Sequence, residues 1–165
     1  MTVKKVILIG SGVRETYIAK RLFIDTNGEI AITVILTKRN PEISSYAKNI
    51  FLVNDFSLET FLCNNHIESF INKNFKEIDF AVIGPEQPLK EGFADFFESI
   101  GIRTIGPKMN LAKLETSKLH CREFLRKNRL SHLSPMWCDI SGMTKFNVYK
   151  NFKFLNKKYG DLVVK

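Results

Sequence analysis

The sequence contains few residues that bind metals or form disulfides. The three cysteines and three histidines are Cys63, Cys121, Cys138, His66, His120 and His132. They form no His-Glu-x-x-His pattern, and no pair has the spacing of zinc ligands. An odd number of widely separated cysteines is typical of reduced, structural thiols. The sequence therefore predicts no metal site and no disulfide framework.

Long apolar runs are also absent. No stretch approaches the roughly 20 residues that span a bilayer as a helix. Residues 1–6 lead directly into an expected strand, without the apolar core and cleavage site of a signal peptide. With 44% hydrophobic and 25% charged residues, the chain has the composition of a soluble globular protein. The absence of a signal-peptide pattern makes the cytoplasm the expected location.

The charge is strongly positive. The net charge of +8 favours contact with anions, which include nucleic acid, membrane surfaces and phosphorylated metabolites. The charge alone does not choose among them, because a solvated lysine-rich face is the most common cause of such a balance.

Short apolar runs alternate with helical patterns in the first two thirds of the chain. The expected strands are residues 6–9, 30–36, 50–53, 80–83 and 103–105. The expected helices are residues 15–23, 58–71 and 91–100, where apolar side chains recur at helical spacing. This alternation predicts an α/β fold, a Rossmann-like doubly wound parallel sheet covered on both faces. In such a sheet, ligands bind beyond the carboxyl ends of the strands.

The pattern changes after Gly106. Residues 111–128 form a charged amphipathic stretch of one or two helices, and residues 146–159 predict another helix. Residues 160–165 read as the beginning of a strand. We therefore expect a Rossmann-like domain over residues 1–107, followed by a helical connection and the incomplete start of a second domain over residues 108–165.

The segment after the first strand is a candidate anion site. Gly10 and Gly12 allow a tight turn and a close approach of backbone N–H groups to an anion at the start of a helix. Ser11 adds a hydroxyl donor and Arg14 a positive charge. A tight turn without a ligand remains an alternative. Glu15 interrupts the Gly-x-Gly-x-x-Gly pattern, which disfavours a dinucleotide cofactor.

The segment after the fourth strand carries a carboxylate. Gly84, Pro85 and Pro88 fix a turn that holds Glu86 at the edge of the expected crevice. Such a carboxylate can accept hydrogen bonds from two ribose hydroxyls. It can equally be a charge that the helix dipole favours at a helix start, and the residues alone leave both interpretations open.

Two lysines are weaker candidates. Lys118 opens a helical stretch in which Arg122 and Arg126 share its face, which indicates either a solvated basic face or a phosphate-backbone contact. No aromatic residues interleave there as stacking platforms for bases, which disfavours nucleic acid. Lys165 ends the apolar pair Val163-Val164, from where a lysine can reach a nucleotide phosphate.

Taken in order, these segments resemble the phosphoribosylamine–glycine ligase family. Residues 10–16 read Gly-Ser-Gly-Val-Arg-Glu-Thr, where the family has Gly-Ser-Gly-Gly-Arg-Glu-His. Residues 83–92 match the family segment Val-Gly-Pro-Glu-x-Pro-Leu-x-x-Gly, except for Ile83. Residues 106–107 and 112–118 match Gly-Pro followed by Ala-x-Leu-Glu-x-Ser-Lys, and residues 163–165 match a Val-Val-Lys strand. The resemblance covers essentially the whole chain.

The resemblance implies an ATP-dependent carbon–nitrogen ligase of purine biosynthesis. This enzyme joins glycine to 5-phosphoribosylamine through a glycyl phosphate. The resemblance also implies a pre-ATP-grasp domain that binds the phosphoribosyl substrate, and then the start of an ATP-grasp domain that binds ATP and magnesium. By the same resemblance, Gly10, Ser11 and Gly12 hold the substrate phosphate, Glu86 holds ribose hydroxyls, and Lys118 and Lys165 reach ATP.

The family's glycine-rich ATP loop and magnesium ligands would follow Lys165. We therefore expect no catalytic residue in this chain, no tight binding of ATP or magnesium, and no activity of the chain alone. The expected partners are small molecules, namely phosphoribosylamine, glycine and ATP, and not a membrane.

The chain departs from the family pattern at three places. Val13 replaces a glycine beside the expected phosphate site, Thr16 replaces a histidine, and residues 37–41 stand where the family has Pro-Gly-Asn. Two alternatives therefore stay open. One is a stand-alone module that binds a phosphoribosyl compound or nucleotide without catalysis, and the other is a basic Rossmann-like protein that binds nucleic acid or a partner.

Overall fold

The computed structural model describes residues 3–163. It divides the chain into two compact units, Met1–Cys121 and Arg122–Lys165. The first unit contains the sheet and both candidate segments that follow its strands. Within residues 3–163, no helix combines the length and the apolar character needed to span a membrane.

All five strands form one parallel sheet. They are β1 (Lys4–Ile9), β2 (Ile30–Leu36), β3 (Ala47–Leu52), β4 (Phe80–Ile83) and β5 (Arg103–Ile105), in the order β3-β2-β1-β4-β5. The predicted parallel sheet is confirmed. β3 begins three residues earlier than the apolar pattern predicts. Lys48 and Asn49 interrupt that pattern, because the side chains of this edge strand alternate between exposed and half-buried positions. The strand order reverses at β1, so the crevice of a doubly wound sheet falls beyond the carboxyl ends of β1 and β4.

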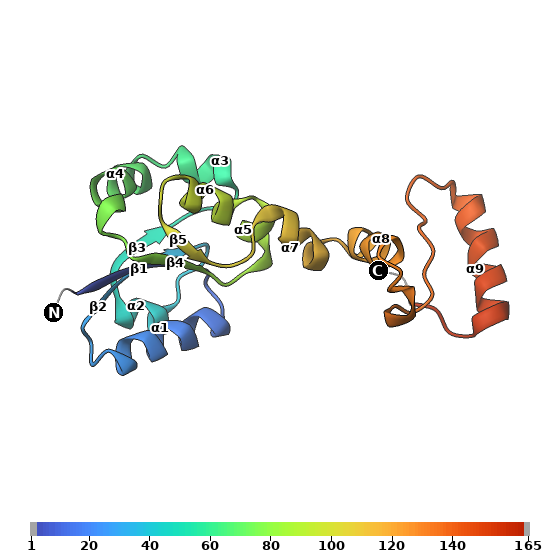
Figure 1. Ribbon diagram of the computed structural model, residues 1–165, viewed down its shortest axis with the longest axis horizontal. Coiled ribbons are helices and arrows are strands. Elements are labelled where there is room, and N and C mark those ends of the chain that lie inside the picture. The colour runs from blue at the N-terminus through green and yellow to red at the C-terminus, as the bar shows by residue number, and fades with distance from the viewer. Residues whose placement is uncertain (1–2, 164–165) are drawn as a thin grey trace. The chain divides into compact units, whose positions relative to one another are not determined.

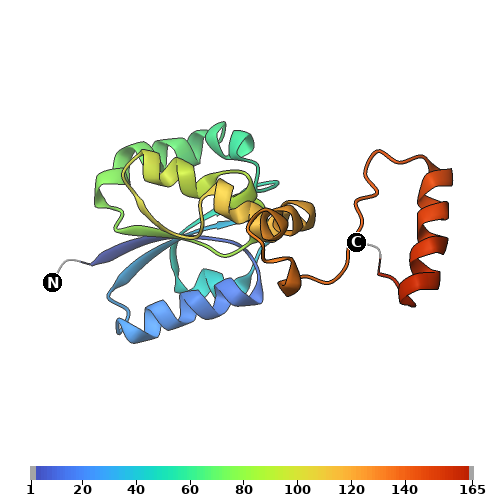
Figure 2. The same ribbon diagram turned by 45° about the vertical axis from the view of Figure 1, so that its right-hand side comes forward.

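Helices cover both faces of the sheet (Figures 1 and 2). One face carries α1 (Val13–Asp25) and α2 (Pro41–Tyr46). The opposite face carries α3 (Leu58–Leu62), α4 (Asn65–Asn74) and α6 (Phe93–Ser99). The short helix α5 (Glu86–Lys90) follows β4, and α7 (Met109–Thr116) packs on α5.

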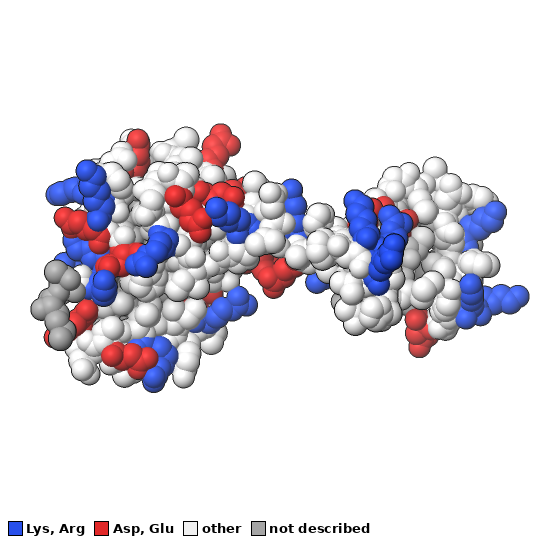
Figure 3. Space-filling model, in the orientation of Figure 1, with Lys and Arg blue, Asp and Glu red and all other residues white. Residues whose placement is uncertain are grey.

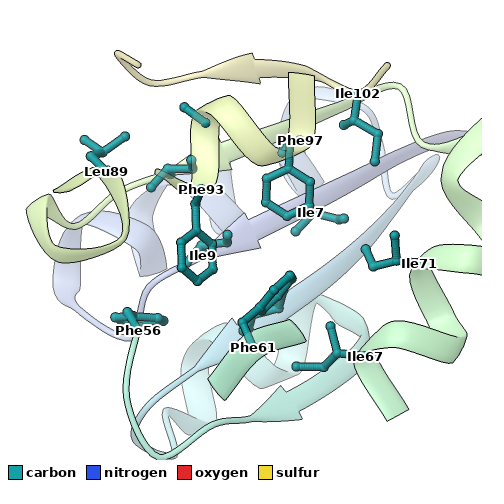
Figure 4. Packing of buried hydrophobic residues seen from close by; sticks show 14 of the residues in the cluster. Ile7, Ile9, Phe56, Phe61, Ile67, Ile71, Leu89, Phe93, Phe97 and Ile102 are labelled. Carbon is teal, nitrogen blue, oxygen red and sulfur yellow. The ribbon is translucent and has the colours of Figure 1, made fainter. Parts of the chain in front are cut away.

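The core beneath α3, α4 and α6 is rich in phenylalanine (Figure 4). The ring centroids of Phe61 and Phe93 lie 4.9 Å apart, and those of Phe96 and Phe97 lie 5.3 Å apart. Phe61, Phe93 and Phe97 are almost completely buried. Burying each such side chain contributes about 1.5–3 kcal/mol, so this layer holds the helices of this face against the sheet.

Three helical details differ from the sequence prediction. The expected helix 58–71 is two helices, because the Asn64 side chain accepts hydrogen bonds from the N–H groups of His66 and Ile67 and starts α4 anew. Residues 86–90 form α5, since Pro88 lies in its first turn, where proline is tolerated. Helix α2 begins after Asn40, with Pro41 in its first turn.

The second unit has a different character. Helix α8 (Lys118–Lys127) crosses the division between the units, and η2 (Ser131–Leu133) and α9 (Lys145–Tyr159) follow it. No residue in the range 122–163 is buried. The expected strand at 160–165 is not formed by residues 160–163, which have no neighbouring strand to pair with, and Val164 and Lys165 lie outside the described residues.

Helix α7 belongs to the sheet unit. Its Ala112 is 2% exposed and lies in the phenylalanine-rich core. The sheet unit therefore continues beyond residue 107, and the domain boundary drawn there from the sequence stays a prediction.

Candidate functional site

The turn between β1 and α1 depends on glycine at position 10. Gly10 has a φ of +130°, which side-chain-bearing residues rarely adopt. A Cβ atom there would lie 2.6 Å from Cγ of Glu15 and 2.8 Å from Cδ of Pro85. The N–H group of Gly10 donates to the carbonyl oxygen of Ile35 at 3.0 Å. This turn is therefore packed between the ends of β2 and β4.

Glu15 is a buried carboxylate at the centre of the site. Its residue is 4% exposed, and its Oε2 atom accepts the N–H of Gly12 at 2.7 Å. Gly10, Gly12 and Gly84 surround the side chain, and a Cβ atom at Gly84 would overlap its Oε1 atom. The sequence analysis used Glu15 only to disfavour a dinucleotide cofactor. The signal that could have placed it is the spacing of a capping box, in which the third helical residue returns to the helix start.

Arg14 joins the two candidate segments. Its Nη1 atom donates to the carbonyl oxygen of Gly84 at 2.8 Å. The N–H of Gly84 donates to the carbonyl oxygen of Ile9 at 3.1 Å, as an extension of the β1–β4 ladder. Glu86 is exposed and is the first residue of α5. The structure thus brings Gly10, Arg14 and the start of α5 to the same carboxyl edge of the sheet.

The segment 37–40 holds the opposite side of the loop. The hydroxyl oxygen of Ser11 accepts hydrogen bonds from the N–H groups of Thr37 at 2.8 Å and Lys38 at 3.3 Å. The amide nitrogen of Asn40 donates to the Ser11 carbonyl oxygen and to the Thr16 hydroxyl, both at 3.0 Å. The sequence analysis missed Asn40. The signal for it is Asn-Pro, a helix cap followed by a first-turn proline.

Two departures from the family pattern have a clear place in the structure. Val13 is 86% exposed, so its side chain faces solvent at the first position of α1. Thr16 is 8% exposed, and its hydroxyl donates to the carbonyl oxygen of Gly12 at 2.9 Å. Thr16 thereby stabilises the turn that the glycines form.

The hydrogen bonds of the loop restrict which donors face outward. The N–H group of Gly10 donates to β2 and that of Gly12 donates to Glu15, and the Ser11 hydroxyl oxygen already accepts two N–H groups. Arg14 and Val13 are exposed at the start of α1. The outward-facing part of the site is therefore the first turn of α1 together with Glu86.

The two candidate lysines are not part of this arrangement. Lys118 is exposed as the first residue of α8, and Lys165 lies outside the described residues. Arg122, on the same face as Lys118, donates to the Ser134 hydroxyl at 2.6 Å. Within residues 3–163, no three His, Cys, Asp or Glu side chains come together as metal ligands would.

Comparison with known proteins gives the family. Residues 4–115 match the family described as phosphoribosylglycinamide synthetase, N domain. The phosphoribosylamine–glycine ligase of Methanocaldococcus jannaschii is 36% identical over 123 residues, which cover 74% of this chain and 26% of that protein. The ligase of Methanococcus vannielii is 32% identical over 169 aligned positions, which cover 98% of this chain and 34% of that protein. The chain thus spans about a quarter to a third of the length of these relatives.

Solved structures give the fold. The biotin carboxylase domain of a single-chain bacterial carboxylase matches 93% of this chain and 34% of its own, with a TM-score of 0.59 at 11% identity. The biotin carboxylase subunit of pyruvate carboxylase matches 96% of this chain and 34% of its own, with a TM-score of 0.53 at 18% identity. The family match over residues 4–115, together with the parallel sheet and the loop geometry, shows that this chain belongs to the phosphoribosylglycinamide synthetase family through its N domain.

Proposed function

We propose that this chain forms the phosphoribosyl-binding part of a phosphoribosylamine–glycine ligase. The whole enzyme would join glycine to 5-phosphoribosylamine with ATP, through a glycyl phosphate. The observation that supports this most strongly is the contact between Arg14 and the carbonyl oxygen of Gly84, because it brings two segments that resemble the family to one sheet edge.

The substrate phosphate would bind at the start of α1. The first N–H groups of a helix have no partner inside it, and the helix dipole favours an anion there. Here the Gly12 N–H is already bound to Glu15, so the N–H groups of Val13 and Arg14 are the better donors. One N–H of the Arg14 guanidinium donates to the Gly84 carbonyl oxygen, and its remaining N–H groups can donate to the phosphate. Gly10, Ser11 and Gly12 would then shape the site more than they bind the phosphate.

The ribose would contact Glu86. Its carboxylate is exposed at the first position of α5, directly after the Gly84-Pro85 turn. A carboxylate has two oxygen atoms that accept hydrogen bonds from neighbouring hydroxyls. An exposed carboxylate at this sheet edge suits a hydroxyl-rich ligand whose phosphate lies at the start of α1.

ATP and magnesium would be bound mainly by the remaining part of such an enzyme. Lys118 and Lys165 are our candidates for contacts to ATP from this chain. The magnesium that accompanies ATP would be held mainly by that remaining part as well, since it is bound through carboxylates together with the ATP phosphates.

Calorimetric titration of glycinamide ribonucleotide and ribose 5-phosphate tests this proposal. Replacing Glu86→Ala should weaken binding about tenfold, the value of one hydrogen bond to a charged group. Gly12→Val should weaken it further, because its Cβ would lie 2.8 Å from Oε2 of Glu15.

Glu59→Ala is the matched control. Glu59 is an exposed acid in the first turn of another short helix, α3. It should leave the affinity unchanged. Equal heats from the wild-type chain, Glu86→Ala and Gly12→Val would overturn the proposed site.

A further inference from the structure

A cavity lies at the amino end of the sheet, opposite the carboxyl edge that holds the candidate site. Its volume is about 390 Å³, and it lies between the amino halves of β1, β2 and β3 and the helix α4. Its polar lining includes Lys5, Lys48, Lys73, His66, Asn49 and Thr33. The candidate substrate site uses none of these residues, since it lies beyond the carboxyl ends of the strands.

The floor of this cavity interrupts an apolar layer. On this face of the sheet, Ile9, Ile35 and Phe51 form one row across three strands, and Ile7, Thr33 and Asn49 form the row below it. Thr33 is 5% exposed and is the polar residue of the otherwise apolar strand β2. The Asn49 amide donates to the Thr33 hydroxyl at 3.1 Å. This polar pair gives the cavity a floor that can form hydrogen bonds.

A register shift adds a charge to this cavity. Ile32 pairs with Ala47 and Thr33 pairs with Asn49, which leaves Lys48 without a partner on β2. Irregularities of this kind redirect a side chain and are frequent next to binding sites. Lys48 lines the cavity as a result.

The cavity carries uncompensated positive charge. Lys5 forms an ion pair with Glu77, which compensates its charge. The Asp79 carboxylate accepts hydrogen bonds from the backbone N–H of Lys5 and from the Lys4 ammonium group. Among residues 3–163, Lys48 and Lys73 form no ion pair. Figure 3 shows basic side chains, with some acidic ones, over the part of the sheet unit where α4 lies. Two free lysines and an imidazole around one hollow favour an anion.

We propose that this cavity binds a small phosphorylated organic molecule. Lysine is a compact point charge that suits phosphate, and the cavity offers no arginine fork for a carboxylate. Phe70 and Ile78 supply an apolar wall for the organic part. The volume falls within the range of about 300–1,000 Å³ that is typical of small-molecule sites. This site is independent of the proposed function of the carboxyl edge.

Amide NMR of the full chain locates the site with defined probes. Adenosine monophosphate should shift the amide signals of Asn49, Ser69 and Asn74 in a saturable way, and adenosine should not. Inorganic pyrophosphate should shift the same signals. Shifts confined to Gly10–Arg14 and Gly84–Glu86, or no saturable shift, would overturn the proposal.

Charge reversal supplies the second test. The double change Lys48→Glu and Lys73→Glu should lower the affinity for adenosine monophosphate by about tenfold or more, since hydrogen bonds to charged groups are lost. Lys90→Glu with Lys113→Glu is the control, because it changes the net charge equally at exposed lysines outside the cavity.

The control pair should change the affinity by less than about twofold, as expected for exposed charges at a distance in salt. Unchanged signals of Leu8 and Val82, which lie in the core on the other face of the sheet, would show that both proteins are folded. An equal loss of affinity in both double variants would mean attraction by net charge alone and would overturn the proposal.

Discussion

At the scale of single residues, the buried carboxylate of Glu15 explains the glycines around it. Gly10, Gly12 and Gly84 come from two segments far apart in the sequence, yet each leaves room for the same side chain. From the sequence, Gly10 and Gly12 indicate an anion site, and Gly84 indicates a turn. The structure shows that they first serve a carboxylate of the protein itself, which holds the Gly12 N–H.

Gly84→Ala tests this explanation. The new methyl group would overlap Glu15, and overpacking of this kind costs about 1–3 kcal/mol of unfolding free energy. In a Glu15→Ala background the same change should cost less than about 0.5 kcal/mol, because the clashing atoms are gone. Urea unfolding of the four proteins in this cycle measures both values. An equal cost in both backgrounds would contradict the explanation.

Asp79 should make the stability of the sheet unit depend on pH. The hydrogen bond from Lys4, at 2.6 Å, and then the N–H of Lys5, at 2.8 Å, hold the pKa of this carboxyl below its usual value. A lowered pKa in the folded state means that the stabilisation is complete above the unfolded-state pKa, about 3.9, and is lost as the pH falls below it.

Asp79→Asn should therefore lower stability at pH 7 and flatten its fall in acid. Thermal unfolding between pH 7 and pH 2 measures both effects. Asp55→Asn is a control at an exposed acid of the same unit. The account is contradicted if Asp79→Asn leaves the acid dependence as steep as in the wild-type chain.

At the scale of elements, the sequence predicts four of the five strands well. β1 and β2 are largely apolar runs, and β4 and β5 are each followed by Gly-Pro. β3 was placed only in part, since an edge strand with Lys48 and Asn49 alternates exposed and half-buried positions. Two helix starts depend on single capping residues, which the periodicity of apolar residues does not reveal. Asn64 starts α4 after α3, and Asn40 starts α2.

Asn40 is the clearest case of such a cap. Its Oδ1 atom accepts the N–H of Ile43, and its amide nitrogen binds Ser11 and Thr16. Asn40→Ala should cost about 1–2 kcal/mol of unfolding free energy through loss of the cap. Urea unfolding measures this. Asn72→Ala, at an exposed position of α4, should change stability by less than about 0.5 kcal/mol, and equal effects at both positions would contradict the role of Asn40.

The candidate site divides in the same way. Gly10, Arg14 and the Gly84–Glu86 turn were recognisable because short motifs directly follow strands, and parallel strands bring their carboxyl ends to one edge. Asn40 and Glu15 each have a local signal, namely Asn-Pro and the spacing of a capping box. Their contacts with Ser11 and Gly84 join different segments, and the order of residues along one segment does not specify such contacts.

At the scale of the whole molecule, the two units differ in how much they bury. The sheet unit has a phenylalanine-rich core, whereas residues 122–163 contain no buried side chain. Large apolar residues such as Phe146 and Phe154 are 73% and 62% exposed. Helix α9 adds lysines without acids, namely Lys145, Lys150, Lys153, Lys157 and Lys158.

We predict that this chain alone does not catalyse the ligation. Acyl phosphate formation needs ATP held in line with its charge neutralised, and the chain spans only about a quarter to a third of its relatives' length. The measurement is ADP release from ATP, glycine and freshly made phosphoribosylamine. Turnover near about one per second, an ordinary enzymatic rate, would contradict the prediction.

The most direct test of the central claim is a crystal structure of the chain with glycinamide ribonucleotide. We predict that a phosphate oxygen lies within hydrogen-bonding distance of the Val13 or Arg14 N–H, and that a ribose hydroxyl contacts the Glu86 carboxylate. A ligand bound at saturating concentration with its phosphate away from the start of α1, or with no ribose contact to Glu86, would contradict the claim.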